Sequence, residues 1–351
     1  MIRISDIIKM GPQGEPHKEN KGGKETSLLD KALKKDTGPD IKQLYNDGID
    51  LLNGIFDKVR QTRQLSPSEV EEYVANSIDF KLVTDYLHKL VDRILLGNGK
   101  VFDYFYAYRQ GNYLHMHSLN TCLLSIKIGI WLNLNKSDLM NIALGGLLHD
   151  LGLVSVEDII SLPRKLKHKE LQKIRQHPVV SARMLEKVKD ITEDVINAVR
   201  GHHKRLTDKD FTKELNSERL QKMAQIIGLA DVYEAITHPR SYREPKLPHE
   251  AVKELVEVES GKFQANIIKS LIGNIGIYPI GSWVRLTDGE IGIVASINKG
   301  YPLRPWINLI FEANGNKLTD IKSIDLLTKP HLHIESPVDI NKNKQLIDKL
   351  K

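Results

Sequence analysis

Apolar residues recur at three- and four-residue steps over most of the chain, a spacing that predicts amphipathic helices. The first such helix begins at about Ile41. A second begins at Ser66-Pro67-Ser68-Glu69, because Ser66 can cap a helix and proline fits its first turn. The helical pattern continues in two pieces and stops at Gly97-Asn98-Gly99. The apolar positions of the first helix are Leu44, Ile49, Leu51, Leu52, Ile55, Phe56 and Val59.

Residues 100 to about 272 keep the same helical period. Ser137 or Asn135 can cap the helix that leads to His149. The predicted helices of this region cover residues 116–131, 137–149, 168–185, 190–203, 216–237 and 248–257.

After Ile275 the period changes from helical to alternating, which predicts strands. Asp288-Gly289 lies between two short apolar runs, and this dipeptide is a strong signal for a β-hairpin. A second strand pair is expected on either side of Asn314-Gly315-Asn316. The four predicted strands cover residues 284–286, 291–297, 306–311 and 317–324.

These elements predict a mainly α protein, a helical bundle with a helical N-terminal region and a small C-terminal β-hairpin appendage. The leader is expected to be disordered, since Gly11-Pro12-Gln13-Gly14 and its neighbours are linker residues without a core-forming period. The predicted divisions are a leader at 1–40, an N-terminal helical region at 41–100, the main helical domain at 101–275, a β extension at 276–330 and a tail at 331–351.

Composition narrows the class of protein. The 351 residues suffice for two domains, and 40% hydrophobic with 27% charged residues is typical of a globular chain. The net charge of +6 is compatible with an anionic partner, but the lysines are spread along the chain among acidic residues. Binding of a nucleic-acid polymer needs a concentrated basic patch with base-reading or stacking residues, so no DNA or RNA partner is expected.

Two further features concern the compartment. Cys122 is the single cysteine, so no internal disulfide can form, which fits a reducing cytoplasm. The first residues contain no apolar stretch of signal-peptide length, and no 18 uncharged apolar residues occur in a row. We therefore expect a cytoplasmic protein without a membrane span.

The segment Gly145-Gly146-Leu147-Leu148-His149-Asp150-Leu151-Gly152 reads as an apolar helix that ends in a His-Asp pair. A buried carboxylate without a partner is costly, so Asp150 must be paired or bind a cation. Taken alone, the dipeptide is more often a helix end with a solvated aspartate. The other histidines of the chain change that interpretation.

Several histidines and lone acids lie in or beside apolar helical segments. Each one alone is more often structural, but a helical bundle can bring such side chains to one internal site. Imidazole with carboxylate suits Fe, Mn, Zn or Ni, and the lack of thiolates disfavours an iron–sulfur site. The candidate ligands are His117, His149, Asp150, His177, His202, His203 and Asp231.

Ordered motifs between about Leu44 and Leu327 resemble the HD superfamily of metal-dependent phosphohydrolases, and within it the HD-GYP group of bacterial cyclic di-GMP phosphodiesterases. The motifs are His117-Ser118-Leu119-Asn120, Leu147-Leu148-His149-Asp150-Leu151-Gly152, His177-Pro178, His202-His203, Ala230-Asp231-Val232-Tyr233-Glu234-Ala235-Ile236-Thr237, Arg240-Ser241-Tyr242-Arg243 and Ile277-Tyr278-Pro279-Ile280-Gly281-Ser282 with the hairpin after it.

The resemblance implies an HD domain that binds two divalent transition metal ions, Fe or Mn foremost, with Zn or Ni as alternatives. The seven candidate ligands would hold them, and Asp150 would bridge both ions and the hydroxide that attacks phosphorus. The implied substrate is a cyclic dinucleotide, with cyclic di-GMP the first choice. Candidate substrate contacts are Arg240, Arg243 and Lys204, which can pair with phosphate, and Tyr242, which can stack on a guanine. A surface charge or ion pair is the alternative for the three cations, and packing is the alternative for Tyr242. A homodimer or a signalling protein partner stays open.

Three departures from the group's pattern leave the seven candidate ligands for two metals in place. His203 is followed by Lys204-Arg205-Leu206-Thr207, and the Asp-Gly-x-Gly-Tyr-Pro signature is absent. Leu153 stands where the group has a lysine that contacts the scissile phosphate. Tyr113 stands where some members have a glutamate for a third metal.

Three functions therefore compete. The first is a phosphodiesterase acting on cyclic di-GMP or a related nucleotide, and the intact ligand set favours both it and the third function. The second is a catalytically weak or inactive, metal-bound receptor for a nucleotide or protein, which the missing signature and Leu153 favour. The third is an HD phosphohydrolase for another phosphate ester.

Overall fold

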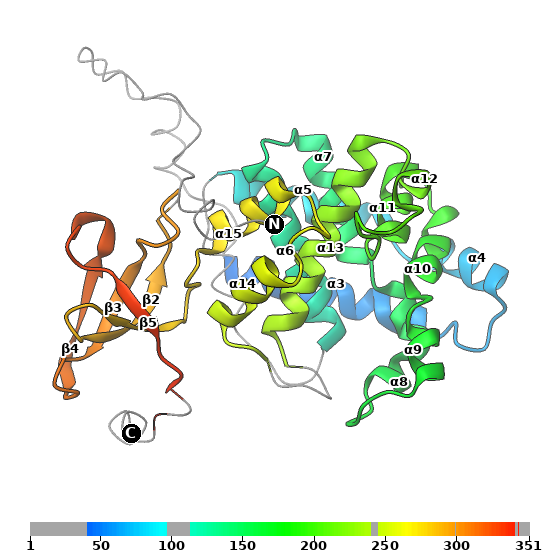
Figure 1. Ribbon diagram of the computed structural model, residues 1–351. Coiled ribbons are helices and arrows are strands. Elements are labelled where there is room, and N and C mark those ends of the chain that lie inside the picture. Colours follow the sequence, from blue (N-terminus) through cyan, green and yellow to red (C-terminus); the bar gives the residue numbers. More distant parts are fainter. Residues whose placement is uncertain (1–40, 97–112, 240–244, 299, 341–342, 344–351) are drawn as a thin grey trace, which may run out of the picture.

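The protein, described here from a computed structural model, consists of a helical body and a separate antiparallel sheet (Figure 1). The structure describes residues 41–96, 113–239, 245–298, 300–340 and 343. The predicted fold class, mainly α with a C-terminal β appendage, is confirmed. The predicted leader at 1–40 lies outside the described residues.

The N-terminal region contains the helices that the apolar pattern predicts. The second helix begins as expected with Pro67 in its first turn, and the backbone N–H of Ser66 donates to Glu69 Oε2 at 2.7 Å. The hydroxyl of Ser66 also bonds to this carboxylate rather than to the helix backbone. The three helices are α3 (Ile41–Arg60), α4 (Pro67–Ser77) and α5 (Phe80–Leu95).

Two long apolar helices follow and form the centre of the body. The first begins at Tyr113, three residues before the predicted start near Met116. The second is capped by Asn135, whose side chain accepts a hydrogen bond from the backbone N–H of Asp138, so Asn135 and not Ser137 is the cap. These helices are α6 (Tyr113–Trp131) and α7 (Lys136–Leu148).

The single helix predicted over 168–185 is two helices, and that prediction was wrong. The break falls at Arg175 and Gln176, and the second helix starts with His177 followed by Pro178. Proline lacks a backbone N–H and is tolerated only in the first turn of a helix, which explains the new start. The remaining helical elements are η2 (Leu151–Val156), α8 (Glu157–Ile160), α9 (His168–Ile174), α10 (His177–Glu186), α11 (Glu193–Gly201), α12 (Phe211–Glu214), α13 (Glu218–Thr237), α14 (Pro248–Glu257) and α15 (Ala265–Ile275).

The C-terminal sheet is antiparallel, with strands in the order β4-β3-β2-β1-β5. Gly289, with φ 91°, makes the turn of the predicted Asp-Gly hairpin. The range 331–351, predicted as a tail, contains a fifth strand, β5, that the sequence did not predict. This strand pairs with β1 through Leu286 and Ile334. This strand is short and polar, so pairing along β1 and not its own hydrophobicity holds it. The strands are β1 (Trp283–Leu286), β2 (Ile291–Ser296), β3 (Trp306–Phe311), β4 (Lys317–Asp325) and β5 (Ile334–Pro337).

Buried apolar side chains form separate cores in the two parts. The helical core is continuous from the N-terminal helices into the later ones, since it includes Phe56, Leu87, Leu119 and Ile227. The sheet has its own core, built from Val284, Leu286, Val294, Ile307, Leu309, Ile324, Leu326 and Leu332.

One described segment, Lys136–Ile160, is long and apolar enough to cross a membrane by length and composition. However, 78% of its most apolar window is buried in the protein. A core helix passes the same test, so this segment is weak evidence for a membrane span.

Candidate metal centre

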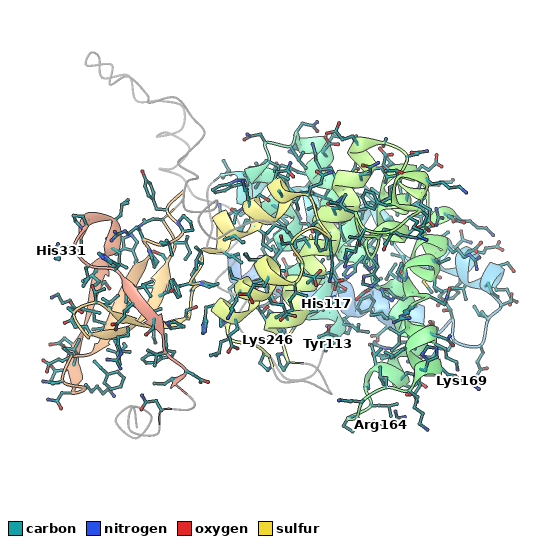
Figure 2. The ribbon with its side chains drawn as sticks, viewed as in Figure 1. Tyr113, His117, Arg164, Lys169, Lys246 and His331 are labelled. Atoms are coloured by element: carbon teal, nitrogen blue, oxygen red, sulfur yellow. The ribbon has the colours of Figure 1, made fainter. Side chains whose placement is uncertain are left out.

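The seven predicted ligand residues lie together inside the helical body. Figure 2 labels one of them, His117, within that body. Several helices contribute to the cluster, and the ligands lie at or near helix ends except for those on α6 and α13. All seven are buried apart from His203, whose side chain is 44% exposed. They are His117 on α6, His149 and Asp150 after α7, His177 at the start of α10, His202 and His203 after α11, and Asp231 on α13.

Three of the histidines are held by the same local contact. The Nδ1 atom of His149 lies 2.9 Å from the carbonyl oxygen of Gly146, and that of His177 lies 2.7 Å from the carbonyl of Ile174. His202 repeats the pattern, 2.6 Å from the carbonyl three residues before it. A carbonyl can only accept, so each Nδ1 carries a hydrogen, and in the neutral ring each Nε2 presents a lone pair.

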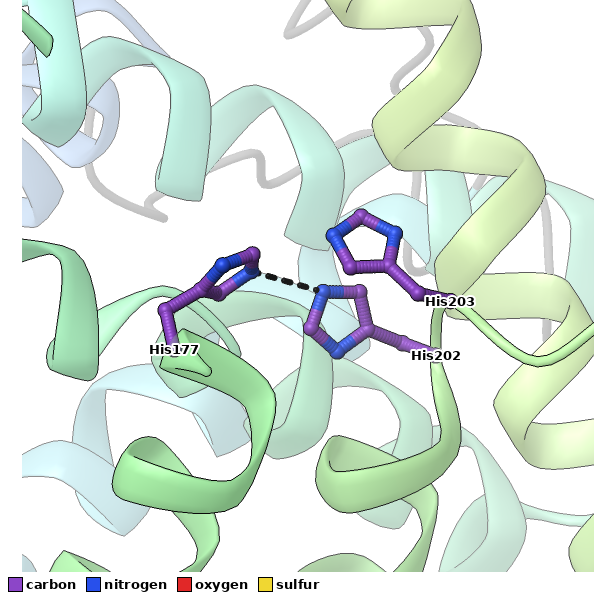
Figure 3. A group of neighbouring side chains, drawn as sticks. All are labelled: His177, His202 and His203. Carbon is purple, nitrogen blue, oxygen red and sulfur yellow. Dashed lines mark hydrogen bonds between the residues drawn. The ribbon is translucent and has the colours of Figure 1, made fainter. Parts of the chain in front are cut away.

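The Nε2 lone pairs face one another within the cluster. The buried Nε2 of His149 has no hydrogen-bond partner among the described residues. His177 Nε2 lies 3.3 Å from His202 Nε2 (Figure 3). Two imidazole lone pairs at this distance repel unless a proton or a cation lies with them. Nitrogen lone pairs fixed by a backbone contact behind the ring are the usual arrangement of histidine metal ligands. The residues therefore fit a metal ion.

Asp150 presents its two carboxylate oxygens to different histidines. Oδ1 lies 3.1 Å from His177 Nε2. Oδ2 lies 3.2 Å from His117 Nε2 and 3.4 Å from His149 Nε2. A carboxylate placed in this way can bridge two cations.

The cluster contains two groups that share no residue. In each group the ligand atoms lie within 4.8 Å of one another, the range expected around one ion. A third group, His149, Asp150 and His202, joins them. The separate groups are His177, His202 and His203 on one side, and His117, His149 and Asp231 on the other.

Burial and the neighbouring histidines shift the pKa values of the two carboxylates, Asp150 and Asp231, in opposite directions. Burial alone would raise the pKa of Asp150, but His149 and His177 hold that pKa well below its ordinary range. Asp231 behaves alike, since a hydrogen bond from His117 lowers its pKa against the effect of burial. Burial and the neighbouring imidazoles also lower the pKa of His202 well below 6.5. Ionised carboxylates and a neutral imidazole are the forms that bind cations.

His117 is held differently from the other histidines. Its Nδ1 bonds to the carboxylate of Glu234, a buried residue three positions after Asp231 on α13. Its Nε2 faces Asp150 and lies 3.2 Å from Asp231 Oδ1. The sequence did not single out Glu234, although its spacing from Asp231 places both carboxylates on one face of the helix.

Two glycines let the backbone segments that carry the ligands approach closely. A Cβ on Gly152 would lie 2.6 Å from the carbonyl oxygen of His177, so glycine allows η2 to pack against the start of α10. A Cβ on Gly228 would overlap the carbonyl oxygen of His202. Only glycine at this position lets His202 lie against α13, one turn before Asp231.

The predicted substrate contacts lack comparable support. Arg240, Tyr242 and Arg243 lie outside the described residues. Lys204 is already engaged, since its ammonium bonds to Asp210 at 2.7 Å and to Glu214 at 2.9 Å, and a phosphate would have to displace both carboxylates.

Leu153 and Tyr113, the two positions that differ from the resembled group in residue type, lie close to the cluster. Leu153, at the position expected to carry a phosphate-binding lysine, is an apolar residue of η2 only 8% exposed. Tyr113 stacks on His117 with ring centroids 5.5 Å apart. An aromatic ring thus occupies the position of the glutamate that serves a third metal in the resembled group.

Arg205 is a cation that the sequence did not single out. Its guanidinium donates to the carbonyl of His202 at 2.8 Å and lies over the ring of Phe263, 4.5 Å from its centroid. Burial lowers the pKa of Arg205, and the charge of Asp231 opposes this effect. Arg205 therefore fixes the backbone of one ligand close to another.

The match to a known protein family covers the same part of the chain as the cluster. Residues 112–267 match the family model of the HD domain, and this range includes all seven residues of the cluster. By this match the helical segment that carries the cluster is similar to HD domains. Residues 283–346 match a KOW domain associated with the HD domain, a range that includes β5.

Named relatives are cyclic dinucleotide phosphodiesterases. The chain is 31% identical to a cyclic di-GMP phosphodiesterase of Pseudomonas aeruginosa, over 61% of this chain and 52% of the relative. It is 25% identical to the cyclic di-GMP phosphodiesterase PdeB of Borreliella burgdorferi, over 66% of this chain and 61% of that protein. A 3'3'-cGAMP-specific phosphodiesterase of Vibrio cholerae is 27% identical over 47% of this chain and 38% of its own length. The alignments thus span between about a third and three fifths of these relatives.

Proposed function

We propose that this protein is a metal-dependent phosphodiesterase that hydrolyses cyclic di-GMP or a related cyclic dinucleotide. The observation that carries the proposal is the pair of ligand groups without a shared residue, with Asp150 facing a histidine of each. Relatives named as cyclic di-GMP and 3'3'-cGAMP phosphodiesterases support the substrate class. Hydrolysis of another phosphate ester stays a weaker alternative.

The site offers what a two-metal centre requires. Divalent cations bound here would lower the pKa of a water and neutralise charge on the phosphoryl oxygens. His149, His177 and His202 would hold the ions through Nε2 atoms that backbone contacts orient beforehand. Asp150, whose two carboxylate oxygens face histidines of both ligand groups, would help to hold the ions and would supply negative charge beside the water that they activate.

Substrate would approach from the side of His203 and Asp231. His203 is the exposed member of the cluster, and its Nδ1 lies 3.7 Å from Asp231 Oδ2. A phosphodiester that reaches the ions from solvent therefore meets these two residues first. Fe or Mn is the proposed metal, because imidazole with carboxylate suits both; Zn and Ni are alternatives.

The second candidate is a metal-bound receptor that binds a cyclic dinucleotide without turnover. The apolar Leu153 and the engaged ammonium of Lys204 favour it, because both remove positive charge that a phosphate would otherwise meet. The location in the cytoplasm and a homodimer or signalling partner stay predictions.

The test is incubation of the full chain, purified without oxygen, with cyclic di-GMP and separately with 3'3'-cGAMP, followed by product analysis. We expect a linear dinucleotide or mononucleotide from at least one substrate, and none from Asp150→Ala. Tight binding of nucleotide to a metal-loaded protein without product would select the receptor. Hydrolysis that persists in Asp150→Ala would contradict the proposed site.

A further inference from the structure

Glu234 is a buried carboxylate that contacts a candidate ligand without belonging to the cluster. Its Oε2 bonds to His117 Nδ1, and its side chain is 1% exposed. His117 Nε2, on the other side of the ring, faces Asp150 and Asp231. Burial of a carboxylate is costly, so the contact with His117 is part of what keeps Glu234 inside the protein.

The second oxygen of Glu234 extends the contact away from the cluster. Oε1 accepts from Asn120 Nδ2 at 3.3 Å and lies 3.3 Å from His238 Nδ1. Asn120 Oδ1 in turn accepts from the hydroxyl of Tyr45 at 3.1 Å. All of these side chains are buried.

This chain of contacts crosses from one region of the protein to another. Tyr45 is on α3, in the N-terminal helical region, whereas Asn120 is on α6, one helical turn after His117. The ring of His117 and the hydroxyl of Tyr45 are therefore linked through only Glu234 and Asn120. Because each member is buried and packed, a displacement of α3 would reach the ring of His117.

The role of Glu234 follows from how the other ligands are held. Backbone carbonyls fix the Nδ1–H of His149, His177 and His202. For His117 a carboxylate takes this place, and a carboxylate behind an imidazole fixes its tautomer and raises its basicity as a ligand. Loss of such a partner typically costs 10- to 100-fold in metal affinity.

We propose that Glu234 is a positioning residue for His117, and that the chain Glu234–Asn120–Tyr45 makes the metal centre sensitive to the packing of α3. The inference rests on the proposed metal-binding function. It assigns the N-terminal helical region a direct route to the metal ligands, so a signal that moves α3 would alter metal binding.

The first experiment compares Mn²⁺ binding to the full chain and to Glu234→Gln by equilibrium titration. Glutamine keeps an acceptor oxygen and removes the charge, so we expect affinity to fall about 10- to 100-fold. The visible spectrum of the Co²⁺-loaded protein should also change, which a purely structural role would not predict. Glu157→Gln is the control, because it neutralises a carboxylate that is paired with Arg60 at 2.8 Å.

The second experiment tests the link to α3. Tyr45→Phe removes the hydroxyl that bonds to Asn120, and we expect Mn²⁺ affinity to fall by less than about tenfold, the scale of one buried hydrogen bond. Tyr86→Phe is the matched control. Its hydroxyl is also buried and bonds to α3, at the carbonyl of Leu44 at 3.2 Å, but this contact does not lead to His117.

A third measurement separates this inference from the proposed function. The ¹⁵N shifts of the His117 ring in metal-free protein report whether Nδ1 carries the hydrogen, and the shifts should change in Glu234→Gln. Wild type that binds Mn²⁺ with unchanged affinity in Glu234→Gln would overturn the inference and leave the proposed function standing. Wild type without Mn²⁺ affinity would overturn the proposed function, while unchanged ring shifts in the variant would overturn the role of Glu234 independently.

Discussion

The helical body and the C-terminal sheet bury different kinds of side chain. In the core of the sheet the buried residues are apolar, among them Val284, Leu286 and Leu309. The helical body buries histidines and carboxylates in its centre, including His149 at 0% exposure and Asp150 at 3%. The first core serves packing alone, whereas the second includes groups whose burial costs free energy.

This difference indicates that the helical body, and not the sheet, holds the proposed metal centre. Charged and imidazole groups stay inside a protein only when partners compensate their loss of water. In the helical body the groups partly compensate one another, as the lowered pKa of Asp150 beside His149 and His177 shows. Within the part of the chain that the structure describes, the Nε2 of His149 has no hydrogen-bond partner, so this nitrogen is available to a cation. Substitutions in the two cores should therefore have separable effects.

The largest effect is expected in the sheet. Leu309→Ala deletes a fully buried side chain of β3 and should lower the free energy of unfolding of the sheet by about 2 to 5 kcal/mol. Metal content should be unchanged, because the sheet contributes no residue to the cluster. Ile321→Ala is the control on the same sheet, since this side chain is 68% exposed and its loss should matter little. Loss of metal in Leu309→Ala would contradict the prediction that substitutions in the core of the sheet leave the metal centre unaffected.

The next effect concerns catalysis. Leu153→Lys restores the cation that the resembled group places near the phosphate, so turnover of a cyclic dinucleotide should rise about ten- to a hundredfold. Steady-state kinetics measure the gain, and metal analysis should show the same content as wild type. Leu153→Met is the matched control without charge. An unchanged rate in a folded, metal-loaded Leu153→Lys variant would show that this position does not meet the phosphate.

A third substitution adds one methyl group beside the ligands. Gly228→Ala would force the carbonyl of His202 away from α13, costing about 1 to 3 kcal/mol of stability. Because His202 moves, Mn²⁺ affinity should fall as well. Gly54→Ala on α3 is the control: its Cβ would meet nothing within 4 Å, so helix propensity predicts a gain of roughly 0.5 to 1 kcal/mol. Denaturant unfolding with Mn²⁺ titration checks both, and unchanged affinity in Gly228→Ala would contradict the packing argument.

The smallest effect is expected for an ion pair of the helical body outside the cluster. The hydrogen bond from Arg60 lowers the pKa of Glu157 below 4.5. A carboxyl with a lowered pKa contributes stability above its unfolded pKa, and this contribution is lost as the pH falls through the folded value. Glu157→Gln should thus cost at most about 1 kcal/mol at pH 7, and the difference from wild type should shrink below pH 4.5. A deficit that stays constant from pH 7 down to the lowest pH at which both proteins remain folded would contradict the charge as its cause.

Much of this arrangement could be predicted from the sequence, for physical reasons. The period of apolar residues located the helices, and Asp288-Gly289 located the first hairpin. Side chains in or beside predicted apolar helices, such as His149 and His177, are candidate ligands by sequence, and the structure places them together. Local signals were strong at these positions.

Features that depend on distant contacts escaped prediction. The strand β5 is short and polar, and its partner β1 lies about fifty residues earlier. The ion pairs of Lys204 with Asp210 and Glu214 depend on how the loop folds back after α11. Glutamate is usually exposed, so the sequence gives no sign that Glu234 is buried. Its burial is explained by His117, which lies beside it on another helix.

The most direct test of the central claim is the metal content of the full chain purified without oxygen, measured by elemental analysis for wild type and Asp150→Ala. The two ligand groups bridged by Asp150 predict two transition-metal ions per wild-type chain, and a clear loss in the variant. A folded wild-type protein that retains no metal and takes up neither Fe²⁺ nor Mn²⁺ would contradict the account.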